Sequence, residues 1–388
     1  MNYPRIYLVL DNCFAIKRWI KPIEWMTIAK DLGFHYVQAS TDNEIDPLFS
    51  TEDYMDDWFC EVKKAEQRTS LKVVNFYTGY QTYRTVGLAH HDKRIRDKIM
   101  NGWIKNLIVR IADLKAKGLG FSFFAVPHAV LQDPLKYGEL LRSLYEQMAR
   151  IAEFAYQNGR VQVSYEQMYA PHQPPFTING TREFIKNIYA ACMKPSYVTI
   201  DVGHMTGQGK FLMPSREKLT DAVLNNKPVW LGSDNAQQMF EEAAAAQSEI
   251  HRNHLIDEIM ADIHEHEYLF STLEDSDVYK WIEELACYSP IFHLQQTNGF
   301  ASSHAAFTPE NNRDGLIRGE RLLCGIKKSY ELNAEKSLQE LVPEIFLSFE
   351  IFTSNTETKK EILTKLKQTI GYWREFVPED GLPLNQLV

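Results

Sequence analysis

Short hydrophobic segments recur along this 388-residue chain, and longer amphipathic segments separate them. The short segments are rich in β-branched and aromatic residues, and almost every position in them is apolar. Continuous apolar character is typical of parallel strands that are buried on both faces. The pattern predicts eight strands, at residues 6–11, 34–40, 72–79, 121–127, 161–168, 197–204, 290–297 and 344–352.

The segments between these strands carry apolar residues at positions i, i+3, i+4 and i+7, the spacing of one helix face. Examples are residues 23–33, 104–118, 139–159, 182–194 and 359–377. Several end in Lys, Arg or Gly, as helix C-termini often do. Eight strands that alternate with helices are typical of the closed (β/α)8 TIM barrel, an α/β fold. An open doubly wound sheet is the alternative, but no GxGxxG motif follows any predicted strand.

Two connections are longer than the rest. Residues 205–289 separate the sixth and seventh predicted strands, and residues 298–343 separate the seventh and eighth. The first contains more than one helical segment, so we expect a single barrel domain over residues 1–388 with a helical insertion at about 205–289. Both connections begin at C-terminal strand ends, where barrel enzymes build their active sites.

The amino-acid composition limits which classes of binding partner and which cellular locations we expect. The chain has 42 Lys and Arg against 51 Asp and Glu, a net charge of −9, and this charge disfavours nucleic acid. The five cysteines are scattered without CxxC spacing, which argues against a disulfide framework or a structural zinc site. The apolar start of the chain is too short for a signal segment, and no apolar run approaches the roughly 20 residues of a membrane helix. We expect a cytoplasmic protein with no membrane partner, and we leave self-association into a homo-oligomer open.

Four polar residues stand within or directly after strands that are otherwise apolar: Glu166, Asp201, His293 and Glu350. Carboxylates are rarely buried unless they are paired or bound to metal. These residues lie near the C-terminal ends of the fifth to eighth strands, which are neighbours in a barrel, so their side chains can converge. Each residue alone is more typical of a helix cap, an ion pair or a core histidine. Together, three carboxylates and one imidazole predict a site for one divalent ion, Mn²⁺, Mg²⁺ or Co²⁺.

This arrangement resembles that of the xylose-isomerase-like barrels, the sugar and sugar-phosphate isomerases and epimerases. Ketose 3-epimerases of this family bind one metal ion through Glu, Asp, His and Glu on strands five to eight. Their Asp lies in an Asp-x-x-His unit, which Asp201 to His204 matches. Residues 293–317 and 10–25 look like a subgroup that acts on small ketoses or their phosphates, associated with tetrulose-phosphate interconversion. The long insertion departs from the compact epimerases.

The resemblance implies that Glu166 and Glu350 are catalytic as well as metal ligands. Isomerisation and epimerisation remove a proton from the carbon beside a carbonyl, and a metal ion stabilises the resulting enediolate. One carboxylate takes the proton and the other returns one. His204 is expected to form a hydrogen bond with a substrate hydroxyl rather than to bind the metal.

Further polar residues follow predicted strands and are candidates for substrate binding. Four of them are cations that could hold a substrate phosphate, although ordinary solvated charges are the alternative: Lys17, Arg18, Arg84 and Arg313. His304 and Asn311 share a loop with Arg313 and are candidate substrate contacts.

The sequence thus favours a metal-dependent isomerase or epimerase of a small ketose or ketose phosphate. A decarboxylase or lyase could use the same metal site, since it would also pass through an enolate. An endonuclease IV-like phosphodiesterase would share the barrel but needs several zinc ions and more histidine ligands. A non-catalytic sugar-binding protein is a further alternative, against which the complete set of four polar residues argues.

Overall fold

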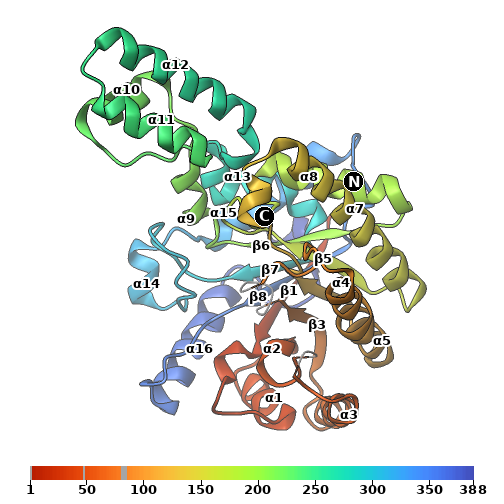
Figure 1. The fold of residues 1–388 in the computed structure, drawn as a ribbon. Coiled ribbons are helices and arrows are strands. Elements are labelled where there is room, and N and C mark those ends of the chain that lie inside the picture. The colour runs from red at the N-terminus through yellow and green to blue at the C-terminus, as the bar shows by residue number, and fades with distance from the viewer. Residues whose placement is uncertain (1, 47–48, 80–84) are drawn as a thin grey trace.

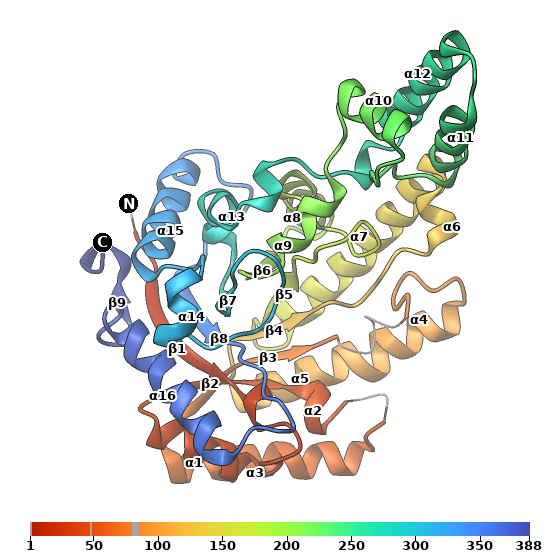
Figure 2. The same cartoon turned by 90° about the vertical axis from the view of Figure 1, so that its left-hand side faces the viewer.

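The computed structural model describes residues 2–46, 49–79 and 85–388. Eight parallel strands close into a barrel, and helices surround it (Figures 1 and 2). The strands are β1 (Arg5–Asp11), β2 (Tyr36–Ser40), β3 (Lys72–Thr78), β4 (Gly118–Phe121), β5 (Gln162–Glu166), β6 (Tyr197–Asp201), β7 (Ile291–Leu294) and β8 (Glu344–Phe349). Each pairs with the next, and β1 pairs with both β2 and β8, which closes the ring. The predicted (β/α)8 barrel is confirmed.

The fourth strand lies earlier than its hydrophobic run predicts. The expected strand at 121–127 is wrong, because β4 spans Gly118–Phe121. Phe123, Phe124 and Val126 are at most 1% exposed although they follow the strand. A hydrophobic sequence indicates that a segment is buried, but not that its backbone pairs with another strand. A buried segment that follows the end of a strand is therefore predicted as part of the strand.

The longer helices of the barrel are α1 (Pro22–Asp31), α3 (Glu52–Thr69), α4 (Lys93–Ile99), α5 (Lys105–Leu114), α7 (Pro134–Gln157), α8 (Ile178–Cys192), α13 (Val278–Leu285), α15 (Gly319–Asn333) and α16 (Lys359–Arg374). Short helices in the connections are α2 (Thr41–Glu44), α6 (His128–Leu131), α9 (Met205–Gln208) and α14 (Pro309–Asp314). The five segments predicted as helical each overlap a helix. Their N-terminal boundaries follow capping chemistry: the Asp133 carboxylate accepts from the backbone N–H groups of Leu135 and Lys136, and α7 begins at Pro134.

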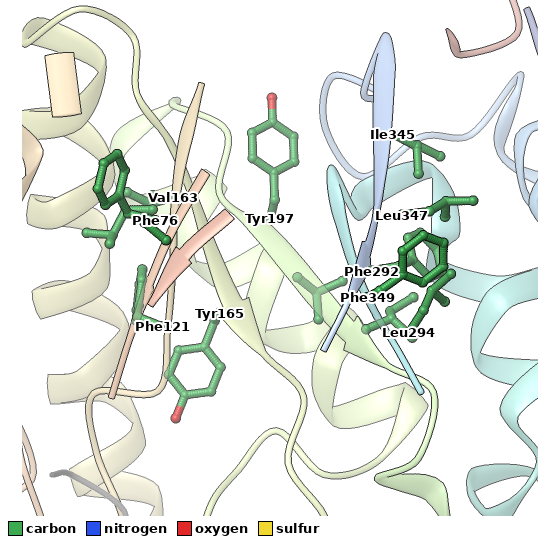
Figure 3. Packing of buried hydrophobic residues seen from close by; sticks show 14 of the residues in the cluster. Phe76, Phe121, Val163, Tyr165, Tyr197, Phe292, Leu294, Ile345, Leu347 and Phe349 are labelled. Carbon is green, nitrogen blue, oxygen red and sulfur yellow. The ribbon is translucent and has the colours of Figure 1, made fainter. Parts of the chain in front are cut away.

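Successive residues of a strand face opposite sides of the barrel wall. In β8, Ile345, Leu347 and Phe349 belong to the main core between strands and helices, which Figure 3 shows with its neighbouring rings. Phe346 belongs instead to a small cluster with Val9 of β1 and Ile291 of β7. The alternation continues past β8, so Glu350 falls on the same side of the wall as Phe346.

A helical arm interrupts the barrel between β6 and β7. It consists of α10 (Arg216–Asn225), α11 (Asp234–Ala245) and α12 (Glu249–Glu265), and it projects from the barrel (Figures 1 and 2). Its buried side chains form a second hydrophobic cluster that also includes residues of α6 and α7, among them Leu131 and Tyr137. The arm therefore has a core of its own, attached to one side of the barrel.

Two further features complete the chain. A short strand, β9 (Leu382–Pro383), pairs antiparallel with the first two residues of β1. The described helices include none with the length and hydropathy needed to cross a membrane.

Candidate metal and substrate site

Four side chains from consecutive strands converge at one end of the barrel. Glu166, Asp201, His293 and Glu350 each offer a ligand atom, and these atoms lie within 4.8 Å of one another. Asp201 and His293 are direct partners in the β6–β7 register, and Glu350 follows the last residue of β8. The sequence predicts this convergence because the four residues end neighbouring parallel strands.

The imidazole of His293 lies among the carboxylates. Its Nδ1 is 2.7 Å from Glu166 Oε1 and 3.5 Å from Glu350 Oε2, and the side chain is fully buried. The hydroxyl of Tyr77 donates to the other oxygen of Glu166. Glu166 is therefore oriented from two sides, with one oxygen directed at the shared centre.

Asp201 is oriented by hydrogen bonds from residues outside the cluster. The amide of Gln295 donates to Asp201 Oδ1 and Oδ2 at 2.8 and 3.1 Å, and the backbone N–H of Gly203 donates to Oδ1 at 2.6 Å. Gly203 packs so closely that an added Cβ would lie 2.4 Å from the Gln295 side chain. This contact explains why a glycine stands in the Asp201–His204 unit.

The electrostatics of the cluster follow from burying several carboxylates beside two histidines. Burial acts to lower the pKa of His293, but Glu350 and Glu166 outweigh it and raise the pKa to about 10. The same balance, with Glu350 the main partner, raises the pKa of His304 to about 9. Burial acts to raise the pKa of Glu350, yet His293 and His304 hold it well below its usual range. Burial raises the pKa of Asp201. The negative charges of the cluster therefore favour a cation at its centre.

The cluster opens into a cavity of about 410 Å³, within the usual size of small-molecule sites. Glu166 and Glu350 reach its wall, as do His204 and His304. His204 Nδ1 lies 2.8 Å from the carbonyl oxygen of Gln167 and so carries the hydrogen, while Nε2, which is 3.7 Å from Asp201 Oδ2, can accept a hydrogen bond from a ligand. The ring of His304 stacks on Phe352 at 3.9 Å between centroids.

The other candidate substrate residues lie elsewhere. Arg18 donates to the carbonyl oxygens of Ser354, Asn355 and Glu357, and Asn311 donates to that of Ala306. Lys17 and Arg313 are exposed, and the described lining of the cavity includes none of these four residues. Arg84 lies outside the described residues.

Several residues of the site were not singled out from the sequence. Lys210, which follows α9, lines the cavity. Gln295 orients Asp201, and Gln38 and Asp11 lie behind His293. Asp11 and Gln38 interrupt apolar strands as the four cluster residues do, so the same criterion, applied to the first two strands, would have found them.

Comparison with known proteins places this geometry in a family. A model of the xylose isomerase-like TIM barrel family matches residues 26–280. The chain belongs to that family.

Solved structures of similar fold agree with this xylose isomerase-like assignment. A D-allulose 3-epimerase from Methylomonas sp. is 12% identical with a TM-score of 0.55, covering 97% of this chain and 99% of its own. A D-psicose 3-epimerase from Clostridium cellulolyticum H10, solved with D-tagatose, is 10% identical with a TM-score of 0.53, covering 95% and 98%. The IOLI protein, solved with a bound zinc atom, is 12% identical with a TM-score of 0.54, covering 95% and 98%. At these identities the likeness shows the fold alone. No curated protein matches the sequence.

Proposed function

We propose that this protein is a divalent-metal-dependent isomerase or epimerase of a small ketose or ketose phosphate. The observation that carries the proposal is the convergence of Glu166, Asp201, His293 and Glu350 beside a cavity of small-molecule size. Similar folds include enzymes that are named as ketose 3-epimerases.

The residues fit a metal ion on chemical grounds. Three carboxylates whose oxygens lie so close together would repel one another without a cation between them. One imidazole and three carboxylates form a mostly oxygen ligand set, which suits Mn²⁺, Mg²⁺ or Co²⁺. When bound there, such an ion supplies a Lewis acid that stabilises negative charge on substrate oxygens.

The two glutamates supply the proton transfer in this proposal. A carboxylate of Glu166 or Glu350 takes the proton from the carbon beside the substrate carbonyl, and the C–H electron pair moves into an enediolate. The other glutamate returns a proton to the opposite face for epimerisation, or to the neighbouring carbon for isomerisation. Both reach the cavity wall, as this role requires.

Substrate binding is assigned to residues around the cavity. His204 presents its Nε2 to a substrate hydroxyl, while His304 is held between Phe352 and Glu350, 3.3 Å from the Glu350 carboxylate. Among the described lysines and arginines, Lys210 is the one that lines the cavity, so we assign it the substrate phosphate in place of the four cations expected from the sequence.

One observation favours this proposal over the phosphodiesterase alternative. Within residues 2–46, 49–79 and 85–388, one group of three or more potential metal ligands is found. A single ion suits proton transfer beside a carbonyl, whereas an endonuclease IV-like site needs ligands for several zinc ions.

The decisive experiment measures the incorporation of deuterium from the solvent into the sugar. Protein loaded with Mn²⁺ or Co²⁺ is incubated in D₂O with tetruloses, pentuloses, hexuloses and their phosphates, and the products are analysed by NMR. We expect one carbon beside the carbonyl to gain deuterium, and a stereoisomer or aldose to form. The chelator-treated protein and the His293→Ala variant serve as controls without activity. A product of carbon–carbon cleavage would instead identify a lyase, and CO₂ released from a keto acid added as a further substrate would identify a decarboxylase.

A further inference from the structure

A buried row of side chains reaches His293 from the side opposite the carboxylates. Gln38 Nε2 lies 2.5 Å from Asp11 Oδ2 and 2.9 Å from His293 Nε2. Gln38 Oε1 accepts from Asn75 Nδ2 at 2.8 Å. All four side chains are at most 1% exposed, so water does not compete for these hydrogen bonds. The proposed proton transfer makes no use of Asp11, Gln38 or Asn75.

The geometry sets a requirement on the ring of His293. Its Nδ1 faces Glu166 and Glu350, so an ion among the carboxylates would bind through Nδ1. A nitrogen that binds a metal carries no hydrogen, and the hydrogen must then reside on Nε2. Metal-bound histidines donate this hydrogen to an acceptor behind the ring. Gln38 is the side chain that faces Nε2, so its amide has to supply a carbonyl oxygen there.

The amide nitrogen of Gln38 faces Nε2 in the structure, and a hydrogen bond in this orientation puts the ring hydrogen on Nδ1 instead. Turning the amide by half a revolution removes the conflict. Gln38 Nε2 then faces Asn75, whose Oδ1 is buried and has no partner in the described structure. If the Asn75 amide also turns, its oxygen accepts from Gln38.

The same turn brings Gln38 Oε1 against the Asp11 carboxyl. Two oxygens at this separation need a hydrogen between them, so Asp11 must carry a proton and donate it to Gln38. Burial raises the pKa of Asp11 and the charge of Glu350 raises it further, and both shifts favour the protonated carboxyl. Its other oxygen continues to accept from the backbone N–H of Cys13 at 2.7 Å. In this arrangement Gln38 accepts from His293 and from Asp11 and donates to Asn75.

We propose that Gln38 is a positioning residue that fixes the tautomer of His293. Backed by Asp11 and Asn75, its carbonyl oxygen holds the hydrogen on Nε2 and leaves Nδ1 open to the ion. The proposal rests on the metal site proposed above. The same amide orientation also suits a ring that carries hydrogen on both nitrogens, so one arrangement serves before and after metal uptake.

Co²⁺ titrations of purified, metal-free protein test this role without reference to turnover. Gln38→Met has a similar volume but no acceptor, and we expect Co²⁺ to bind about 10–100-fold more weakly, the usual effect of losing such a partner. The double variant D11N/Q38E places a permanent acceptor against the ring, with the Asn amide donating to a Glu carboxylate that faces Nε2. We expect it to bind Co²⁺ as tightly as the parent or more tightly.

Ser164→Ala is the matched control, because Ser164 accepts from Thr199 at 2.9 Å inside the barrel and contacts none of the four cluster residues among the hydrogen bonds described. Circular dichroism and thermal unfolding of the metal-free proteins identify variants that fail to fold; D11N/Q38E then carries the test alone. Unchanged affinity in Gln38→Met, or weak binding by a folded D11N/Q38E, overturns the positioning role. A parent protein that binds no Co²⁺ would overturn the proposed metal site itself.

Discussion

Metal binding by this protein should become tighter as the pH rises, because the ion must displace a proton from His293. In the structure this ring lies 2.7 Å from one carboxylate and 3.5 Å from another, and these negative charges raise its pKa to about 10. The ring therefore carries a proton at neutral pH. The ion and the proton compete for the same nitrogen, Nδ1.

The size of the effect follows from the pKa. At pH 7 the ring is about three units below its pKa, so removing the proton costs about 4 kcal/mol, or roughly 10³-fold in affinity. The dissociation constant should fall about tenfold for each pH unit between pH 7 and 9. His304, with a pKa of about 9, adds to the slope if it also loses its proton when the ion neutralises Glu350. The slope should thus correspond to between one and two protons.

The raised pKa of His293 also makes the free energy of unfolding of the metal-free protein depend on pH. The folded-state pKa of His293 lies above the value of about 6.5 for an unfolded histidine. Its contribution to stability is therefore complete below about pH 6.5 and is lost as the pH rises through about 10. Metal-free protein should lose stability across this window, and metal-loaded protein should not lose the part that His293 contributes.

The assay is a Co²⁺ or Mg²⁺ titration at pH 6.5, 7.5 and 8.5, with calorimetry in two buffers of different ionisation enthalpy to count the protons released. His293→Asn keeps an oxygen ligand that does not titrate, so its slope should be about one proton smaller. His266→Gln is a matched control, since His266 is a buried histidine outside the cluster. A dissociation constant that stays constant from pH 6.5 to 8.5, with no proton released, would refute the reasoning.

Three more predictions follow from the site. Glu166→Gln and Glu350→Gln should each retain metal at reduced affinity while turnover falls by roughly 10²–10⁴-fold, and parent-like turnover in either variant would exclude that glutamate from proton transfer. Elemental analysis should find one divalent ion per chain in the parent and much less in His293→Ala; equal contents would exclude His293 as a ligand. Lys210→Ala should raise KM for a ketose phosphate but not for the unphosphorylated ketose, and equal changes for both would remove Lys210 from phosphate binding.

The strand order and the four converging residues could be read from the sequence because they depend on a simple rule. Strands buried on both faces give apolar runs, and a charged residue ending such a run needs a physical reason to be there. The rule identifies Glu166, Asp201 and His293 from the sequence alone. It was less reliable for β4, where Gly118 and Gly120 carry no side chain that signals a strand, and where an added Cβ on Gly118 would lie 2.7 Å from Asn75.

The substrate side of the site could not be predicted in the same way, because loops are positioned by tertiary contacts. Arg18 follows β1 as a phosphate-binding cation would, yet carbonyl oxygens after β8 hold its guanidinium. Lys210 is separated from β6 by a helical turn, α9, and nothing in its local sequence distinguishes it from other lysines. The hydrogen bonding of Gln38 depends on partners from three other strands, which no spacing along the chain reveals.

The pairing of β1 with β8 has a consequence for the order in which the molecule can assemble during synthesis. The edge of β1 that faces β8 has no barrel partner until residues 344–349 have left the ribosome. The cluster is then still incomplete, because Glu350 is the next residue of the chain. Until the ring closes, Glu166, Asp201 and His293 can offer an ion three ligands at most. Saturating metal during translation should therefore favour only the late step of ring closure, and nascent chains stalled before β8 should not retain the ion.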